Sequence, residues 1–175
     1  MAKLKAPTKA SVTTAISLMT SDMEENTEDI KESENGLELI PDSAFRILIQ
    51  AGQAEKISPN ASGVITWQLA MLDDDNQLYL RLISNGSGGL FSKDWVSLDE
   101  IKRVLENQSK DGFTSSVFKA LFKGASTNNA GFLAAVLRCP DICLIEQHHE
   151  KLFTHVLYPD WIDRLEKLSQ ISIQD

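Results

Sequence analysis

The stretch TSSVFKALFKGASTNNAGFLAAVLRCPDICLIEQHHEKLFTHVLYPDW, residues 114–161, decides the fold because it combines two helical patterns, a tight turn and a hairpin. Apolar residues at helical spacing predict a helix over about residues 115–123, and Gly124 stands where a helix C-cap needs a positive φ. A Ser-Thr pair then predicts the cap of a further helix, which Pro140 stops. A short turn containing glycine between two such helices is typical of a helix-turn-helix.

Strand-like runs follow this pair of helices, ICLIEQ at residues 142–147 and KLFTHVL at residues 151–157, and they predict a hairpin. Upstream, the segment VSLDEIKRVLENQ predicts another helix, because Ser97 and Glu100 have the spacing of a capping box. The order helix, helix, helix, strand, strand, over about residues 94–158, resembles the winged-helix superfamily in topology. The resemblance implies a winged helix-turn-helix module and rests on no family motif.

Three further elements complete the expected fold. Pro41 and Asp42 predict the start of a helix, since the apolar residues that follow share one helical face. Alternating apolar residues over 64–71 and 77–82, joined by an acidic turn, predict a β-hairpin with one buried face. Residues 158–168 predict a C-terminal helix. The expected fold class is therefore α+β, with an N-terminal helix and β-hairpin followed by a winged helix-turn-helix module and a C-terminal helix.

The composition changes near residue 35. Residues 1–35 carry no aromatic side chain and are rich in Ser, Thr, Lys and Glu, so they bury too little apolar surface to offset the entropy of ordering. We predict a disordered acidic arm over residues 1–35 and a single folded domain over residues 36–175. No apolar run reaches the length of about 20 residues that a membrane-spanning helix needs, and no secretory leader is recognisable. A cytoplasmic protein without a membrane partner is expected.

The charge distribution bears on the class of partner. The chain carries a net charge of −8, which disfavours a polyanion at long range. Residues 93–151, however, hold eight basic and eight acidic side chains, so the predicted module is locally neutral. Local neutrality keeps duplex DNA open as a partner but supplies no basic patch.

The first functional hypothesis is a winged-helix DNA-binding protein, such as a small transcriptional regulator, that reads DNA through the third helix and the hairpin. Asn128 is suited to pair with adenine, and Arg138 to contact guanine or phosphate. Lys119 and Lys123, one turn apart, are suited to hold phosphates. The predicted DNA-binding residues are Lys119, Lys123, Thr127, Asn128, Arg138 and Lys151.

The alternative hypothesis is a non-enzymatic protein-interaction module that uses the same surface. Asn128, Gly131, Ala135 and Arg138 share one face of the third helix, and the small residues on this face let the helix approach another surface closely. This face could pack against the first hairpin, the terminal helix, a second subunit or another protein. DNA binding ranks narrowly first only because this topology commonly serves nucleic-acid recognition.

Other kinds of site fit the sequence poorly. Cys139, Cys143 and the three histidines form the string C-x3-C-x4-H-H-x5-H, which lacks the usual spacing of zinc ligand pairs, so buried thiols are expected. The glycine-rich stretch at residues 84–92 lacks the ending of a phosphate-binding loop, and the aspartates at residues 73–75 lack the rest of a calcium loop. No nucleophile motif is present. We expect no enzyme activity, metal or cofactor.

Overall fold

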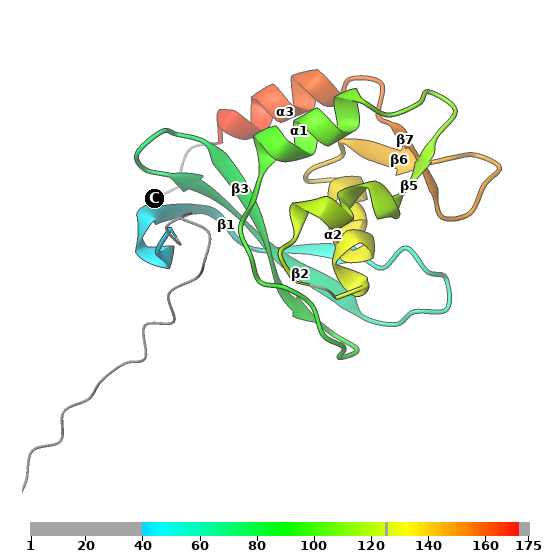
Figure 1. The fold of residues 1–175 in the computed structure, drawn as a ribbon, viewed down its shortest axis with the longest axis horizontal. Helices are drawn as coiled ribbons and strands as arrows, with labels where there is room; N and C mark the ends of the chain where they lie inside the picture. Colours follow the sequence, from blue (N-terminus) through cyan, green and yellow to red (C-terminus); the bar gives the residue numbers. More distant parts are fainter. Residues whose placement is uncertain (1–39, 125, 172–175) are drawn as a thin grey trace, which may run out of the picture. The chain divides into compact units, whose positions relative to one another are not determined.

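An antiparallel sheet of four strands forms the first half of the folded chain (Figure 1). The computed structural model describes residues 40–124 and 126–171, so the predicted arm over residues 1–35 lies outside the described residues. The strands neighbour one another in chain order. They are β1 (Phe45–Glu55), β2 (Val64–Leu72), β3 (Leu78–Asn85) and β4 (Val96–Ser97).

Strand β1 occupies the segment for which the sequence predicts an N-terminal helix, so that prediction is wrong. Only the 3-10 turn η1 (Asp42–Ala44) is helical there. The pairing of β1 with β2 shifts register between Ile47 and Ile49 and again between Ile49 and Gly52. Such irregularities interrupt the alternation of inward and outward side chains, so the apolar residues of this strand have a spacing that imitates a helix.

The predicted hairpin of β2 and β3 is confirmed, and β3 alternates between buried and partly exposed residues, but β2 is buried on both faces from Trp67 to Leu72. The two strands pair antiparallel, and one face of each is buried in the main core. The apolar residues on this inner face are Ile65, Trp67, Leu69, Leu78, Leu80 and Leu82, all at most 7% exposed. The hydrophobic effect on this face holds the sheet against the helices that follow.

Gly52 and Trp67 explain how β1 fits against β2. The two residues are paired across the strands, and the indole ring of Trp67 lies over the glycine. A Cβ atom at position 52 would lie 2.2 Å from Cε2 of Trp67, far inside van der Waals contact. The fully buried indole therefore requires glycine at position 52.

The second half of the chain contains three α-helices, a 3-10 segment and a small sheet of three strands (Figure 1). The hydroxyl of Ser97 accepts a hydrogen bond of 3.2 Å from the Asp99 amide and caps the first of these helices. The segment predicted as a helix over about residues 115–123 is a 3-10 helix. The elements are α1 (Leu98–Glu106), β5 (Phe113–Thr114), η2 (Ser115–Leu121), α2 (Asn128–Arg138), β6 (Ile145–Gln147), β7 (Thr154–Leu157) and α3 (Trp161–Ser169).

Helix α2 lies at the centre of the core. It contacts β1 and β2 of the large sheet, β6 of the small sheet, and η2. The small sheet has the order β5-β7-β6, with all neighbours antiparallel. The buried apolar residues of α2 are Ala130, Leu133, Ala134, Ala135, Val136 and Leu137. The two sheets therefore share one core through this helix.

Among the described residues, no helix combines the length and the apolar character needed to cross a membrane.

Candidate functional site

One face of α2 lines two neighbouring hollows in the surface. Asn128, Gly131, Ala135 and Arg138 are three or four residues apart, so they share this face, as the sequence predicts. Ala135 and Arg138 border the larger hollow, of about 590 Å³, which we call hollow A. Asn128 and Gly131 border the smaller one, of about 250 Å³, which we call hollow B.

Lys56 and Ile57 border both hollows, so the hollows are adjacent, and we refer to them together as the α2 groove. These two residues follow directly on β1. The Lys56 ammonium lies 5.9 Å from the centre of the Phe132 ring and is hydrogen-bonded to the Ser87 hydroxyl. The groove thus runs between the end of β1 and the small face of α2.

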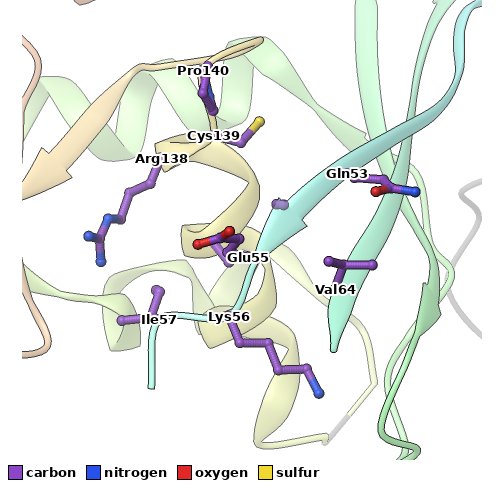
Figure 2. A pocket seen from close by; sticks show the side chains of 10 residues that line it. Gln53, Glu55, Lys56, Ile57, Val64, Arg138, Cys139 and Pro140 are labelled. Atoms are coloured by element: carbon purple, nitrogen blue, oxygen red, sulfur yellow. The ribbon is translucent and has the colours of Figure 1, made fainter. Parts of the chain in front are cut away.

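Hollow A has one wall from the sheet and one from the end of α2 (Figure 2). Gln53 and Glu55 come from β1, and Val64 from the start of β2. Arg138 and Pro140 come from α2 and the residues just after it. Ala135 is only 3% exposed, because the end of β1 lies close to the helix here.

The charges of hollow A leave a basic excess. Arg138 and Lys56 border it together with a single carboxylate, that of Glu55. Among the described residues, no carboxylate lies within 4.0 Å of either basic group. Arg138 instead donates a hydrogen bond of 2.9 Å from Nη2 to the Gln147 side-chain oxygen, and burial lowers the pKa of its guanidinium. The groove is therefore complementary to a negatively charged group.

Hollow B is more apolar and adjoins an exposed turn. Phe132 of α2 and Phe153 of the turn before β7 both border it. Leu152 and Phe153 are 52% and 49% exposed. Phe153 has a φ of +63°, a backbone conformation that is rare for a bulky residue and costs about 1–3 kcal/mol. The turn therefore places the aromatic ring of Phe153 at the edge of hollow B, although the backbone conformation of Phe153 is unfavourable for this residue type.

His155 is the one buried titratable group that borders hollow B among the described residues. Its side chain is 1% exposed, and its Nδ1 atom has no hydrogen-bond partner. Burial, followed by the positive charge of Arg138, lowers its pKa from 6.5 to about 4. The ring of Phe113, at 5.9 Å between centroids, covers it from β5. The imidazole is therefore neutral at pH 7 and offers both a donor and an acceptor.

The buried state of His155 predicts a stability that depends on pH. The unfolded chain binds a proton on this residue below pH 6.5, whereas the folded chain does so only near pH 4, so stability falls as the pH falls through this window. The full effect is roughly 3 kcal/mol, from about 1.36 kcal/mol per pKa unit. Urea unfolding at several pH values should show a steeper loss for the wild type than for His155→Gln. His149→Gln, at an exposed position, is the matched control, and equal curves for the wild type and His155→Gln would contradict the prediction.

The residues predicted to bind DNA extend along α2 and its surroundings, and Thr127 borders both hollow B and a third hollow. Lys119 and Lys123 are exposed and border a third hollow, of about 300 Å³, together with Thr127. Asn128 borders hollow B, and its side-chain amide donates a hydrogen bond of 3.0 Å to the Leu90 carbonyl. The amide that the DNA hypothesis assigns to base reading therefore fixes a loop of this chain.

The remaining two predicted residues lie near the hairpin. Arg138 borders hollow A, with Gln147 as its partner. Lys151 is exposed in the turn between β6 and β7, where its backbone amide donates a hydrogen bond of 3.3 Å to Nδ1 of His148. The Glu150 amide donates to the same atom at 3.1 Å, so His148 organises the turn.

The side of the α2 groove that α2 forms follows from the sequence, whereas the residues on its other sides do not. Lys56 and Ile57 follow a segment predicted as a helix, and Phe153 and His155 belong to a hairpin read as a DNA-contacting element. His155 lies in β7, but Phe153 lies in the turn before that strand with a φ of +63°, so strand alternation does not group the two residues. Nothing local in the sequence joins these residues to Lys56, about a hundred positions away.

The two cysteines differ in their environments. Cys139 is buried, and burial raises the pKa of its thiol. Cys143 is partly exposed and has a φ of +48°. Within residues 40–124 and 126–171, no group of three or more His, Cys, Asp or Glu side chains is arranged to hold a metal ion. The rings of His148 and His149 stack on each other at 4.6 Å.

Comparison with known proteins gives no relative: no family model, no curated protein and no solved structure matches this chain.

Proposed function

We propose that the protein is a non-enzymatic protein-interaction module that binds a partner polypeptide in the α2 groove. The observation that carries this proposal is the position of the groove. It follows the small face of α2 and is bordered by two basic groups, Lys56 and Arg138, that have no carboxylate of the described residues within 4.0 Å. In hollow B it is bordered by the exposed Phe153, which follows the exposed Leu152. Exposed apolar side chains beside a preformed groove are typical of protein-binding surfaces. We place this activity in the cytoplasm.

The arrangement of the second half supports a winged-helix module over about residues 94–158. The order α1, β5, η2, α2, β6, β7 and the sheet order β5-β7-β6 both fit that architecture, with α2 as the third helix. The hairpin of β6 and β7 then corresponds to the wing. In this assignment the large sheet packs against part of the α2 surface that would otherwise be exposed. The α2 groove lies beside this contact, where α2 is no longer covered by the sheet.

Duplex DNA is the second candidate partner, favoured by the exposed Lys119 and Lys123. A DNA-reading third helix must enter the major groove with its side chains free. Here α2 contacts β1 and β2, Ala135 is 3% exposed, and Asn128 is hydrogen-bonded to Leu90. The burial of α2 therefore supports a polypeptide partner over a DNA groove.

Site-specific photo-crosslinking tests the proposal. A photoreactive residue at Gln53 in hollow A or at Ala61 in hollow B should link the protein to a discrete partner polypeptide in its native cells. The same residue at Arg103, exposed on α1, should not. Gly131→Leu should fill hollow B and weaken partner binding about tenfold without lowering the melting temperature, because nothing lies within 4 Å of a Cβ at this position.

Duplex binding of the unmodified protein at low salt is the companion measurement. We expect none. Binding to duplexes, with Lys119→Ala and Lys123→Ala each lowering the salt slope by about one unit, would favour the DNA candidate instead. Equal crosslinking from the groove and from Arg103 would count against the protein-interaction proposal.

A further inference from the structure

Strand β1 has a free edge beside hollow A. It stands at the end of the strand order and pairs only with β2 among the described strands. It is 11 residues long, contains no lysine or proline, and has only Arg46 and Glu55 as charged residues. Natural edge strands are usually shielded by lysines, prolines, short length or β-bulges, and of these β1 has only its two register shifts. Its two register shifts lie before Gly52, so they leave the last residues of the strand regular.

The regular end of this edge is the part that borders the groove. Gln53, Ala54 and Glu55 line hollow A on the strand side, and α2 with the residues after it forms the opposite wall (Figure 2). A groove between an open strand edge and a helix is a setting for strand addition, in which the edge supplies backbone hydrogen bonds and pockets select side chains. The alternate backbone amides and carbonyls of β1 point away from β2 and need such partners.

We propose that the partner binds as an extended segment that adds a strand to the free edge of β1 and places one acidic side chain at Lys56 and another at Arg138, whose side chains point to opposite sides (Figure 2). This inference rests on the proposed function and names the chemistry of its partner. An apolar side chain of the segment enters hollow B. The basic groups of hollow A, which have no carboxylate within 4.0 Å in the described part of the chain, favour the acidic residues, and the apolar lining of hollow B, with Phe132 and Phe153, favours the apolar one.

A foreign segment suits this edge better than a second copy of the chain. Two copies of β1 paired antiparallel about their centre would bring the acidic Glu55 of one chain toward Arg46 of the other, and Arg46 already pairs with Asp73 of its own chain. Such a pairing supplies no acidic group from β1 to Lys56 and Arg138 beyond this one. An acidic segment from another protein brings the opposite charge, so complementarity favours it.

A displayed library of random peptides, selected on the full chain, tests the proposal. We expect selected peptides to combine an apolar residue with a nearby Asp or Glu and to lack helix-forming patterns. In a synthetic copy of one selected peptide, each backbone amide is then methylated in turn, and binding is measured by fluorescence polarisation. Methylation at every second amide should weaken binding about fivefold or more, because only alternate amides face β1.

Charge variants test the second half of the proposal. Lys56→Gln and Arg138→Gln should each weaken binding of the acidic peptide by about fivefold, and a peptide with its acid replaced by the amide should lose this sensitivity. Arg103→Gln, on the exposed face of α1, is the matched control and should leave the affinity unchanged. Circular dichroism establishes that each variant is folded.

The outcomes separate this inference from the proposed function. Groove-specific crosslinks together with a methylation profile that has no alternation would overturn strand addition and leave the interaction module standing. Failure of both the groove crosslinks and the peptide selection would overturn both. Sedimentation showing a dimer that Gln53→Pro dissociates would assign the edge to a second copy and overturn the foreign segment.

Discussion

Replacing Trp67 by alanine should destabilise the protein by about 3–5 kcal/mol, the usual cost of removing a large buried aromatic side chain. Trp67 is fully buried at the centre of β2 and belongs to the main core. Its ring also fills the space over Gly52, so alanine would leave a cavity between two strands. Urea unfolding measured by circular dichroism gives the difference. A loss below about 1 kcal/mol would show that the core does not close around this ring as described.

Trp67→Phe tests the contribution of the buried indole N–H separately from that of the aromatic ring. The indole Nε1 is buried and has no hydrogen-bond partner among the described residues. A buried donor without a partner costs about 1–3 kcal/mol, so removing it offsets part of the volume that phenylalanine loses. We therefore expect Trp67→Phe to be much milder than Trp67→Ala. Equal losses for the two variants would contradict this account.

Replacing Gly52 by valine should cost about 3 kcal/mol or more, because overpacking a filled site displaces its neighbours. The added Cβ would meet the Trp67 ring at 2.2 Å, and the paired strands cannot move apart without breaking their ladder. Calorimetric melting of the full chain measures the loss. Gly131→Ala is the matched control, since its Cβ meets nothing within 4 Å and alanine stabilises a helix interior by about 0.5–1 kcal/mol.

The double variant Gly52→Ala with Trp67→Ala isolates the contact between the two residues. If the ring is what excludes a side chain at position 52, the two losses should be strongly non-additive, with the alanine at position 52 tolerated once the ring is gone. Additive losses would show that Gly52 is needed for its backbone conformation instead.

Much of the fold was predictable because its signals are local. The hairpin of β2 and β3 shows alternation over most of its length, the Ser97 cap marks the start of α1, and Pro140 follows the end of α2. β1 was mispredicted because its irregular register removes the alternation, and the partner that explains Gly52 is a tryptophan 15 positions away. The pairing of β1 with β2 therefore outweighed the helix-like spacing of apolar residues in this segment.

The candidate site also has a part that could be predicted from the sequence and a part that could not. The small face of α2 follows from helical periodicity, so Asn128, Gly131, Ala135 and Arg138 could be grouped from the sequence. Lys56 and His155 could not, because their approach to that face depends on how the large sheet and the final hairpin pack on α2. The lowered pKa of His155 likewise arises from burial and from Arg138, which only the folded chain brings about.

The central position of α2 has a consequence for how the molecule can come apart. This helix contacts β1 and β2 on one side and β6 and η2 on others, so opening either sheet uncovers the same apolar residues. We therefore expect neither half to unfold as an independent unit, and we expect the backbone amides of α2 to exchange with solvent only through global unfolding. A fragment cut near residue 94 would expose the apolar residues of α2 that β1 and β2 cover, and we expect it to aggregate. We expect the shortest autonomous unit to include the large sheet, and a partner bound in the α2 groove to stabilise the whole domain.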